Sequence, residues 1–130
     1  MPLMKFDLIK GQRSETEIDQ LLEITYEVML STFGAPVGDQ YQVVNQHDSY
    51  EMKIKDTGLG IKRTAQVMVL TLVTRPRTTQ QKQAFYRQLV DRLHSEMAIR
   101  PEDVVISLVV NQDEDWSFGN GEAQFLTGEL

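Results

Sequence analysis

The amino terminus carries the residue with the least ordinary chemistry. The chain begins Met-Pro, and an initiator methionine is normally removed when the second residue is small. Without Met1, Pro2 carries a secondary amine whose pKa, close to the α-amino value of about 7.7–8.0, neighbouring charges can move to either side of neutrality. The neutral amine is a general base or an imine-forming nucleophile, and the cation is a general acid. Most chains that begin in this way make no use of the proline, but here a predicted strand follows at once and fixes its position.

Two closely spaced arginines form a second candidate. The sequence Thr74-Arg-Pro-Arg77 follows an apolar segment, and side chains two residues apart share one face of an extended chain. Pro76 keeps the residue before it extended. Arg75 and Arg77 can therefore converge on one carboxylate, although two unrelated arginines in a solvated loop fit the sequence equally well. Asp39, a third candidate, follows a Gly-rich turn, where a lone aspartate is usually a turn former.

Other catalytic constellations are absent from the sequence. Gly58 and Gly60 form a motif of the G-x-G type, which is too short for a phosphate loop. His47 and His94 lack metal-ligand spacing, and Ser117 lies outside a G-x-S-x-G context. The chain has no cysteine, which excludes a disulfide framework and a thiolate metal site.

Composition predicts one soluble domain spanning residues 1–130. Hydrophobic residues make up 41 % and charged residues 25 % of the chain. The formal charge of −6, without a basic stripe carrying aromatics, argues against a nucleic-acid partner. No apolar run approaches the roughly 18 residues of a membrane span, and charged residues interrupt the start of the chain where a signal peptide would be apolar. We therefore expect a cytoplasmic protein with no membrane partner.

The charges are unevenly distributed along the chain. Residues 57–90 contain basic but no acidic side chains, whereas residues 101–130 contain acidic but no basic ones. This pattern fits two solvated surfaces of opposite sign. It also fits a local positive field that holds a small anion despite the negative total.

Capping residues and apolar periodicity predict the elements that must position these side chains. Residues 2–9 alternate as a half-buried strand does. Ser14-Glu-Thr-Glu17 is a capping box, in which the hydroxyl and the carboxylate satisfy orphan N–H groups at a helix start. Apolar residues at three- and four-residue steps give this helix one apolar face. Gly34, followed by Pro36, predicts where the helix ends. Strands are expected at 41–44 and, more briefly, at 50–54.

The predicted order of strand, helix and strand repeats in the second half of the chain. Residues 67–73 form a near-continuous apolar run, typical of a strand covered on both faces. Thr78-Thr-Gln-Gln81 is a second capping box, and it opens an amphipathic helix that Arg100-Pro101 stops. Residues 104–110 form another buried strand. The order β-α-β is thus predicted twice, at an offset of about 64 residues between the capping boxes.

These elements predict an α/β (α+β) fold made of two tandem β-α-β units. The units span about residues 1–60 and 61–112 and share one sheet, with two helices on one face. The other sheet face needs a cover, for which another subunit is expected. Residues 113–130 contain the only tryptophan and three glycines, which predicts an ordered hairpin or a segment that clasps a neighbouring subunit.

Taken together, these residues resemble the tautomerase superfamily, in particular its malonate semialdehyde decarboxylase group. The resembling segments run through the whole chain: PLMKFDLI at 2–9, GAPVGDQYQ at 34–42, DTGLGIKRT at 56–64, TRPR at 74–77, QKQAFYRQL at 81–89 and DEDWSFGNGEAQFLTGEL at 113–130. The resemblance implies that Pro2 is the catalytic amine and that Asp39 orients or polarises a reacting group. It further implies that Arg75 and Arg77 bind the substrate carboxylate, and that Trp116 and Phe118 line the pocket. It also implies a homotrimer without a metal or organic cofactor.

The leading functional hypothesis is a cofactor-free lyase that decarboxylates a small 3-oxo acid of the malonate semialdehyde type. A keto–enol tautomerase acting on 2-oxo acids such as phenylpyruvate uses the same residues, and hydration of a 3-halo or acetylenic acid is a possible side activity. A non-catalytic trimeric interaction module is the alternative from another class. The joint presence of Pro2, Asp39, Arg75 and Arg77 argues against that alternative, because a binding module does not need all four.

Overall fold

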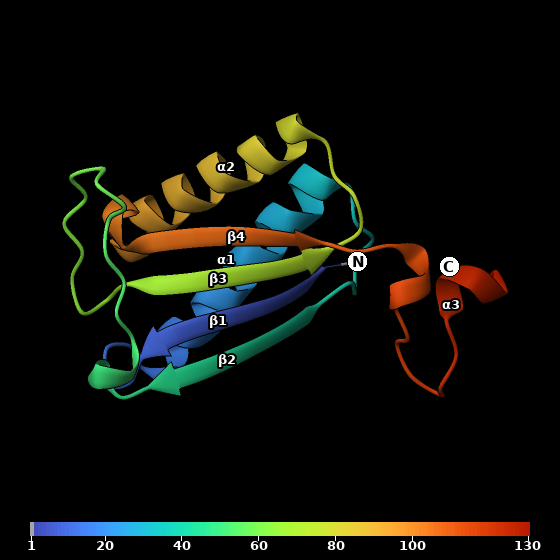
Figure 1. The fold of residues 1–130 in the computed structure, drawn as a ribbon, viewed down its shortest axis with the longest axis horizontal. Helices are drawn as coiled ribbons and strands as arrows, with labels where there is room; N and C mark the ends of the chain where they lie inside the picture. Colours follow the sequence, from blue (N-terminus) through green and yellow to red (C-terminus); the bar gives the residue numbers. More distant parts are fainter. Residues whose placement is uncertain (1) are drawn as a thin grey trace.

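A computed structural model describes residues 2–130; Met1, whose removal the sequence predicts, lies outside the described residues. The main elements follow the chain in the order β1 (Leu3–Ile9), α1 (Glu15–Phe33), β2 (Tyr41–His47), β3 (Met68–Thr74), α2 (Thr79–Met97) and β4 (Val104–Val110). The strands form one sheet in the order β2-β1-β3-β4 (Figure 1). Strands pair in parallel within each unit, and β1 pairs antiparallel with β3. The two predicted β-α-β units are therefore confirmed.

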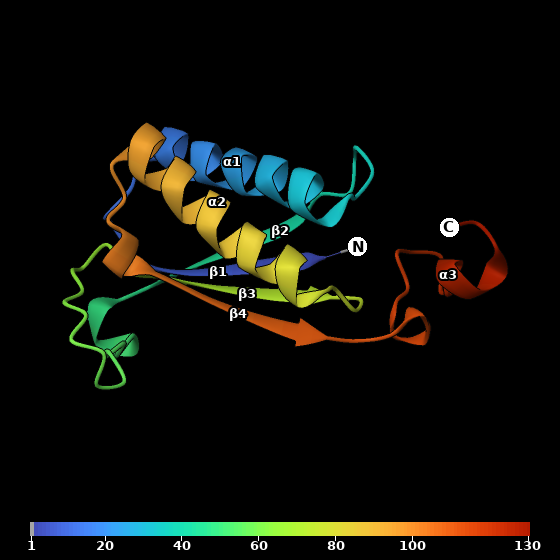
Figure 2. The same ribbon diagram turned by 90° about the horizontal axis from the view of Figure 1, so that it is seen from above.

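Both long helices lie on the same face of the sheet, as predicted (Figure 2). Alternate residues of β1 and β3 point to that face and are almost fully buried: Met4, Phe6, Leu8, Met68, Leu70 and Leu72. Leu21 and Met29 of α1 and Phe85 and Leu89 of α2 meet them in one core. Burial of each such side chain contributes about 1.5–3 kcal/mol, so packing rather than intrinsic propensity holds the helices in place.

Each helix begins at the capping box that the sequence predicts. The Ser14 hydroxyl accepts a hydrogen bond from the Glu17 amide at 3.2 Å, and the Glu17 carboxylate accepts one from the Ser14 amide at 3.0 Å. Thr78 and Gln81 make the same reciprocal pair at 3.1 and 2.9 Å. Because these bonds satisfy donors that have no partner inside a helix, they fix where α1 and α2 start.

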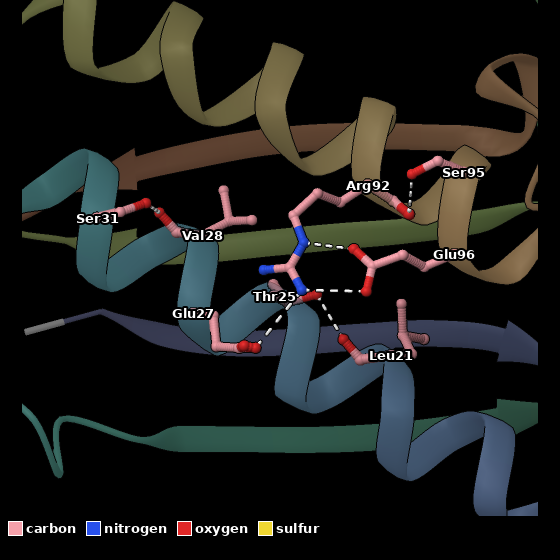
Figure 3. Close-up of polar contacts among 8 residues, drawn as sticks. All are labelled: Leu21, Thr25, Glu27, Val28, Ser31, Arg92, Ser95 and Glu96. Atoms are coloured by element: carbon pink, nitrogen blue, oxygen red, sulfur yellow. Dashed lines mark hydrogen bonds and ion pairs between the residues drawn. The ribbon is translucent and has the colours of Figure 1, made fainter.

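Polar contacts at the helix interface supplement the apolar core (Figure 3). Arg92 of α2 donates to Glu96 on its own helix at 2.6 Å, and it reaches Glu27 of α1 at 3.5 Å. Thr25 is buried, and its hydroxyl donates to the Leu21 carbonyl at 2.7 Å. This bond satisfies the hydroxyl within the core, where an unpaired polar group would be costly.

The two halves are built to the same dimensions. In each unit the strand, helix and second strand have 7, 19 and 7 residues. Residues 13–39 correspond to residues 77–103 at a constant offset. The correspondence includes the turn after each helix, where the amide of Asp39 or Asp103 donates to the carbonyl three residues earlier. Because β1 and β3 are antiparallel, equivalent residues of the two units lie at opposite ends of the sheet.

Two sequence predictions about local structure are wrong. Residues 50–54 form no strand: a 3-10 turn (η1, Ser49–Glu51) begins there instead, with the Glu51 carboxylate accepting from the Asp48 amide at 2.9 Å. Of the two alternatives expected for the tail, the hairpin is wrong: residues 113–130 form a 3-10 turn (η3, Asp113–Asp115) and a short helix (α3, Gln124–Thr127) beyond the end of the sheet (Figures 1 and 2). The clasp of a neighbouring subunit stays a prediction.

The Gln124 side chain holds this tail together. It accepts from the Phe118 amide at 2.9 Å and donates to the Gly119 carbonyl at 2.8 Å. The buried side-chain amide of Gln124 thus makes two hydrogen bonds to the backbone, in place of those that the second strand of a hairpin would have made. None of the helices within residues 2–130 has the length and apolar character that a bilayer crossing requires.

Candidate active site

Sheet register gathers the candidate residues at one end of the molecule. Leu3, the first residue of β1, pairs with Tyr41 of β2 and with Val73 of β3. Pro2 directly precedes Leu3, so it lies at this end of the sheet next to the start of β2 and the end of β3. It is buried there, beside the segment that carries Asp39 and the segment that carries Arg75.

Three of the predicted site residues line one cavity of about 220 Å³. The turn after α1 supplies one wall, the loop after β3 supplies the two arginines, and the tail supplies an apolar wall. The lining residues are Gly34, Ala35, Pro36, Asp39, Arg75, Arg77, Phe125 and Leu130. The cavity therefore combines one carboxylate, two guanidinium groups and an apolar side, which suits a small carboxylic acid.

Asp39 is buried, with 3 % of its surface exposed. Burial raises the pKa of its carboxyl group, and the positive charges of Arg77 and Arg75 oppose that effect. Its turn is closed by the Asp39 amide, which donates to the Pro36 carbonyl at 3.1 Å. Asp39 is therefore more than a turn former, because its carboxylate lies in the cavity with both arginines.

Arg77 is attached to the body of the protein through three contacts. Its Nε donates to the Thr74 hydroxyl at 3.1 Å, and its Nη1 donates to the Phe33 carbonyl at the end of α1, also at 3.1 Å. The guanidinium carbon lies 4.9 Å from the centre of the Phe33 ring. Burial lowers the pKa of Arg77, and the neighbouring charge of Arg75 adds to that effect.

Arg75 links the cavity to the tail. Its Nη1 donates to Asp113 at 2.8 Å, and its guanidinium carbon lies 3.9 Å from the centre of the Phe125 ring. Its Nε is buried and has no hydrogen-bond partner among residues 2–130. An unpaired buried donor is costly, so this nitrogen is a candidate donor to a bound anion.

Trp116 and Phe118 lie behind Phe125, which itself lines the cavity. The two rings stack with centres 5.2 Å apart, and Phe118 contacts Phe125 edge-on at 5.5 Å and Tyr41 at 5.3 Å. Within residues 2–130 it is Phe125 and Leu130, rather than these two, that line the cavity. Sequence reasoning did not select Phe125 or Leu130 as site residues, although both belong to the tail segment that carries the family resemblance.

The opposite end of the sheet holds a closed counterpart of this arrangement. Arg13 and Asp103 occupy the positions equivalent to Arg77 and Asp39. Asp103 accepts from the amide and the hydroxyl of Thr64 at 2.7 and 2.6 Å, and Arg13 donates to the Gln66 carbonyl at 2.6 Å. The position equivalent to Pro2 at the same offset is Gln66, which lies inside the chain and has an amide nitrogen. This second end therefore offers no proline amine.

The two histidines lie outside the cavity. The His47 ring contacts Asp7 at 2.7 Å, and the His94 ring contacts the Ile99 carbonyl at 3.3 Å. Across residues 2–130, no three His, Cys, Asp or Glu residues are grouped so that they could hold a metal ion.

The fold and this cavity together define a class of enzyme. A family model described as a tautomerase enzyme matches residues 39–119. The Bacillus subtilis (strain 168) protein named Probable tautomerase YrdN is 46 % identical over 130 residues, covering 100 % of both chains. Probable tautomerase YusQ from the same organism is 39 % identical over 127 residues, covering 97 % of this chain and 99 % of its own. The chain belongs to the tautomerase superfamily and is an enzyme of that superfamily.

Solved structures add a more specific likeness. A malonate semialdehyde decarboxylase, described as having decarboxylase and hydratase activities, is 47 % identical with a TM-score of 0.95, over 98 % of each chain. The FG41 malonate semialdehyde decarboxylase inhibited by 3-bromopropiolate is 29 % identical with a TM-score of 0.93, over 98 % of this chain and 97 % of its own. A fused 4-OT described as a symmetric trimer shares the fold at 17 % identity and a TM-score of 0.77, over 97 % and 98 %.

Proposed function

We propose that the protein is a cofactor-free lyase that decarboxylates a small 3-oxo acid of the malonate semialdehyde type. The observation that carries this proposal is the cavity in which Asp39, Arg75 and Arg77 meet, with Pro2 next to it in the sheet register. The similarity to malonate semialdehyde decarboxylase supports the proposal. That protein was also studied with its residue-1 proline replaced by alanine.

In this proposal the two arginines hold the substrate carboxylate. Charge-assisted hydrogen bonds from Arg75 and Arg77 orient it so that the breaking carbon–carbon bond lies perpendicular to the plane of the 3-oxo group. The bond then breaks to release carbon dioxide, and its electron pair moves toward the carbonyl. Protonation of the resulting enol carbon yields acetaldehyde from malonate semialdehyde. On the iminium route, protonation of the enamine carbon gives an iminium ion, which water hydrolyses to acetaldehyde and the free Pro2 amine.

Pro2 supplies the electron sink. As a cation it hydrogen-bonds the carbonyl oxygen, and as a neutral amine it condenses with the carbonyl to form an iminium ion. Arg75 and Arg77 disfavour a positive charge on Pro2, whereas ionised Asp39 favours it. The buried Asp39 carboxylate is thus the group that balances the two arginines around the amine.

A keto–enol tautomerase is the second candidate function. The two Bacillus subtilis relatives carry the name tautomerase, and proton transfer between keto and enol forms needs the same amine in its neutral state. Hydration of an unsaturated acid is a further candidate side activity, because the decarboxylase relative is described as having hydratase activity as well.

We further propose that the functional unit is a homotrimer. The sheet face opposite the helices exposes apolar side chains, with Val43 48 % and Val109 49 % exposed. Exposed apolar side chains of this kind favour a contact surface, and a second and third copy of the chain would cover them. The fused 4-OT with the same fold is described as a symmetric trimer.

The test is carbon-13 NMR of Met1-processed protein, checked by intact mass, with labelled malonate semialdehyde. We expect labelled carbon dioxide and acetaldehyde to appear well above the buffer rate. Pro2→Ala, which keeps a primary amine, should lose most of that turnover while unfolding at a similar temperature. Turnover of enol-phenylpyruvate without decarboxylation would favour the tautomerase, and absence of both reactions would favour the interaction module.

A further inference from the structure

The turn that carries Asp39 is tied to the helix layer by a tyrosine. The side chain of Tyr26, on α1, is 9 % exposed, and its hydroxyl oxygen accepts a hydrogen bond from the Gly38 amide at 2.7 Å. Gly38 immediately precedes Asp39. The Tyr26 hydroxyl therefore binds the residue directly before Asp39, whose side chain lines the cavity.

Two backbone hydrogen bonds close the turn itself. The Asp39 amide donates to the Pro36 carbonyl at 3.1 Å, and the Gln40 amide donates to the Gly38 carbonyl at 2.8 Å. Gly38 has φ of +94°, a backbone conformation that side chains rarely adopt, and Val37 projects into solvent. The internal bonds shape the turn, whereas the Tyr26 hydroxyl holds it against α1.

We propose that Tyr26 is a positioning residue for the active site: its hydroxyl fixes the 36–39 turn so that the Asp39 carboxylate stays buried beside Arg75 and Arg77. The kinetic part of this proposal rests on the proposed function, because it assigns Asp39 a role near the reacting group. The structural part does not, since it concerns only where the carboxylate lies. The equivalent position in the second unit is Val90, so the tie belongs to the active end alone.

Removal of the hydroxyl should expose Asp39 to water. In Tyr26→Phe the Gly38 amide loses its acceptor and must turn toward solvent to find another. Because burial is the main cause of the raised pKa of Asp39, greater hydration should bring that pKa back toward its ordinary value. The arginines still bind the substrate carboxylate, so we expect kcat to fall about tenfold with KM changed less than about twofold.

The test compares wild type, Tyr26→Phe and the control Tyr86→Phe, a half-buried tyrosine on α2 whose ring contacts Phe85. The first readout is the carbon-13 NMR titration of the Asp39 carboxyl, assigned by its loss in Asp39→Asn. The second is kcat and KM for malonate semialdehyde. We expect the titration midpoint to move down and kcat to fall in Tyr26→Phe, with neither change in Tyr86→Phe.

The two readouts separate the possible failures. An unchanged Asp39 titration in folded Tyr26→Phe would overturn the positioning role. A shifted titration in a protein without decarboxylase turnover would instead overturn the proposed function and leave the role of Tyr26 standing. If Tyr26→Phe does not fold, hydrogen exchange of the Gly38 amide in the wild type decides. Strong protection supports the tie, and exchange at the rate of an unstructured amide overturns it.

Discussion

Arg75 and Arg77 are two residues apart but are held in different ways. Arg77 donates to the last carbonyl of α1 and to the Thr74 hydroxyl, so part of its hydrogen-bonding capacity stabilises the fold. Arg75 donates to the half-exposed Asp113 and retains a buried Nε without a partner in the described chain. Of the two arginines, Arg75 is therefore the one with a buried donor left unused within the described chain.

This difference predicts that the two alanine variants will separate binding from stability. Arg75→Ala should raise KM about tenfold or more, the loss expected for about 1.5–3 kcal/mol of a charged hydrogen bond, with little change in unfolding temperature. Arg77→Ala should raise KM and also lower the unfolding temperature. Steady-state kinetics and thermal unfolding measure both. A large drop in stability for Arg75→Ala alone would reverse the assignment.

Burial of Asp39 makes stability depend on pH in a defined direction. Its pKa is raised in the fold from the ordinary 3.8, so the folded chain holds the proton more tightly than the unfolded chain. The ionised form is thus the destabilising one, and its cost grows as the pH rises from about 3.8 through the raised pKa.

We therefore expect Asp39→Asn to gain stability relative to the wild type as the pH rises from acid to neutral. Urea unfolding across that range measures the gain. Asp19→Asn, on the exposed surface of α1, provides the control for loss of one negative charge. A stability difference that is constant with pH, or that shrinks as the pH rises, would contradict the effect of burial.

At the scale of the elements, the duplicated β-α-β unit has one end with an open cavity and one end closed by hydrogen bonds. The Arg13 and Asp103 end keeps the charged pair but uses it to hold residues 64–66. Asp103 is 1 % exposed and accepts two hydrogen bonds from Thr64. It therefore serves stability, whereas its counterpart Asp39 serves the cavity.

Asp103→Asn should destabilise the chain by about 1–3 kcal/mol, because a buried charged acceptor is lost. Catalysis at the opposite end should stay within about twofold of wild type. Glu102→Gln, on the half-exposed neighbouring residue, is the matched control and should change neither property. Chemical unfolding and kcat/KM are the measurements. A selective loss of activity would show that the closed end is coupled to the site.

Sequence patterns predicted the elements that carry their own local signals. Ser14 and Thr78 mark the helix starts, and the apolar runs mark β3 and β4. The expected strand at 50–54 failed because alternation does not supply a hydrogen-bonding partner, and Asp48 with Glu51 stabilises a turn there. The expected hairpin in the tail failed because the side chain of Gln124 replaces the partner strand.

The site was less predictable from spacing alone. Asp39 and Arg75 meet only because β1 lies between β2 and β3 in the sheet, which no local pattern reveals. In the sequence Asp39 is only a lone aspartate after a Gly-rich turn, and its role beside the reacting group is implied by the family resemblance. Phe125 and Leu130 reach the cavity through the path of an irregular tail, whose geometry depends on contacts such as that of Phe125 with Arg75.

For the whole molecule, the open sheet face is the feature that the single chain does not explain. Tyr41, Val43 and Val109 expose apolar surface opposite the helices. If three copies bury this face, Val43→Glu should convert the trimer to smaller species, because a buried unpaired charge is strongly unfavourable. Leu59→Glu, in an exposed loop, should leave the assembly intact.

Light scattering coupled to size exclusion measures the mass of both variants. Unchanged trimers in Val43→Glu would mean that this face is not the interface. A monomeric wild type would remove the trimer from the account altogether.

The most direct test of the central claim compares the same chain with and without Met1. Retention of Met1 makes the Pro2 nitrogen an amide while leaving every site side chain in the sequence. Both forms are verified by intact mass and assayed with labelled malonate semialdehyde. We expect acetaldehyde and carbon dioxide from the processed form and only the buffer rate from the unprocessed form. Equal turnover by the two forms would show that the Pro2 amine is not the catalyst.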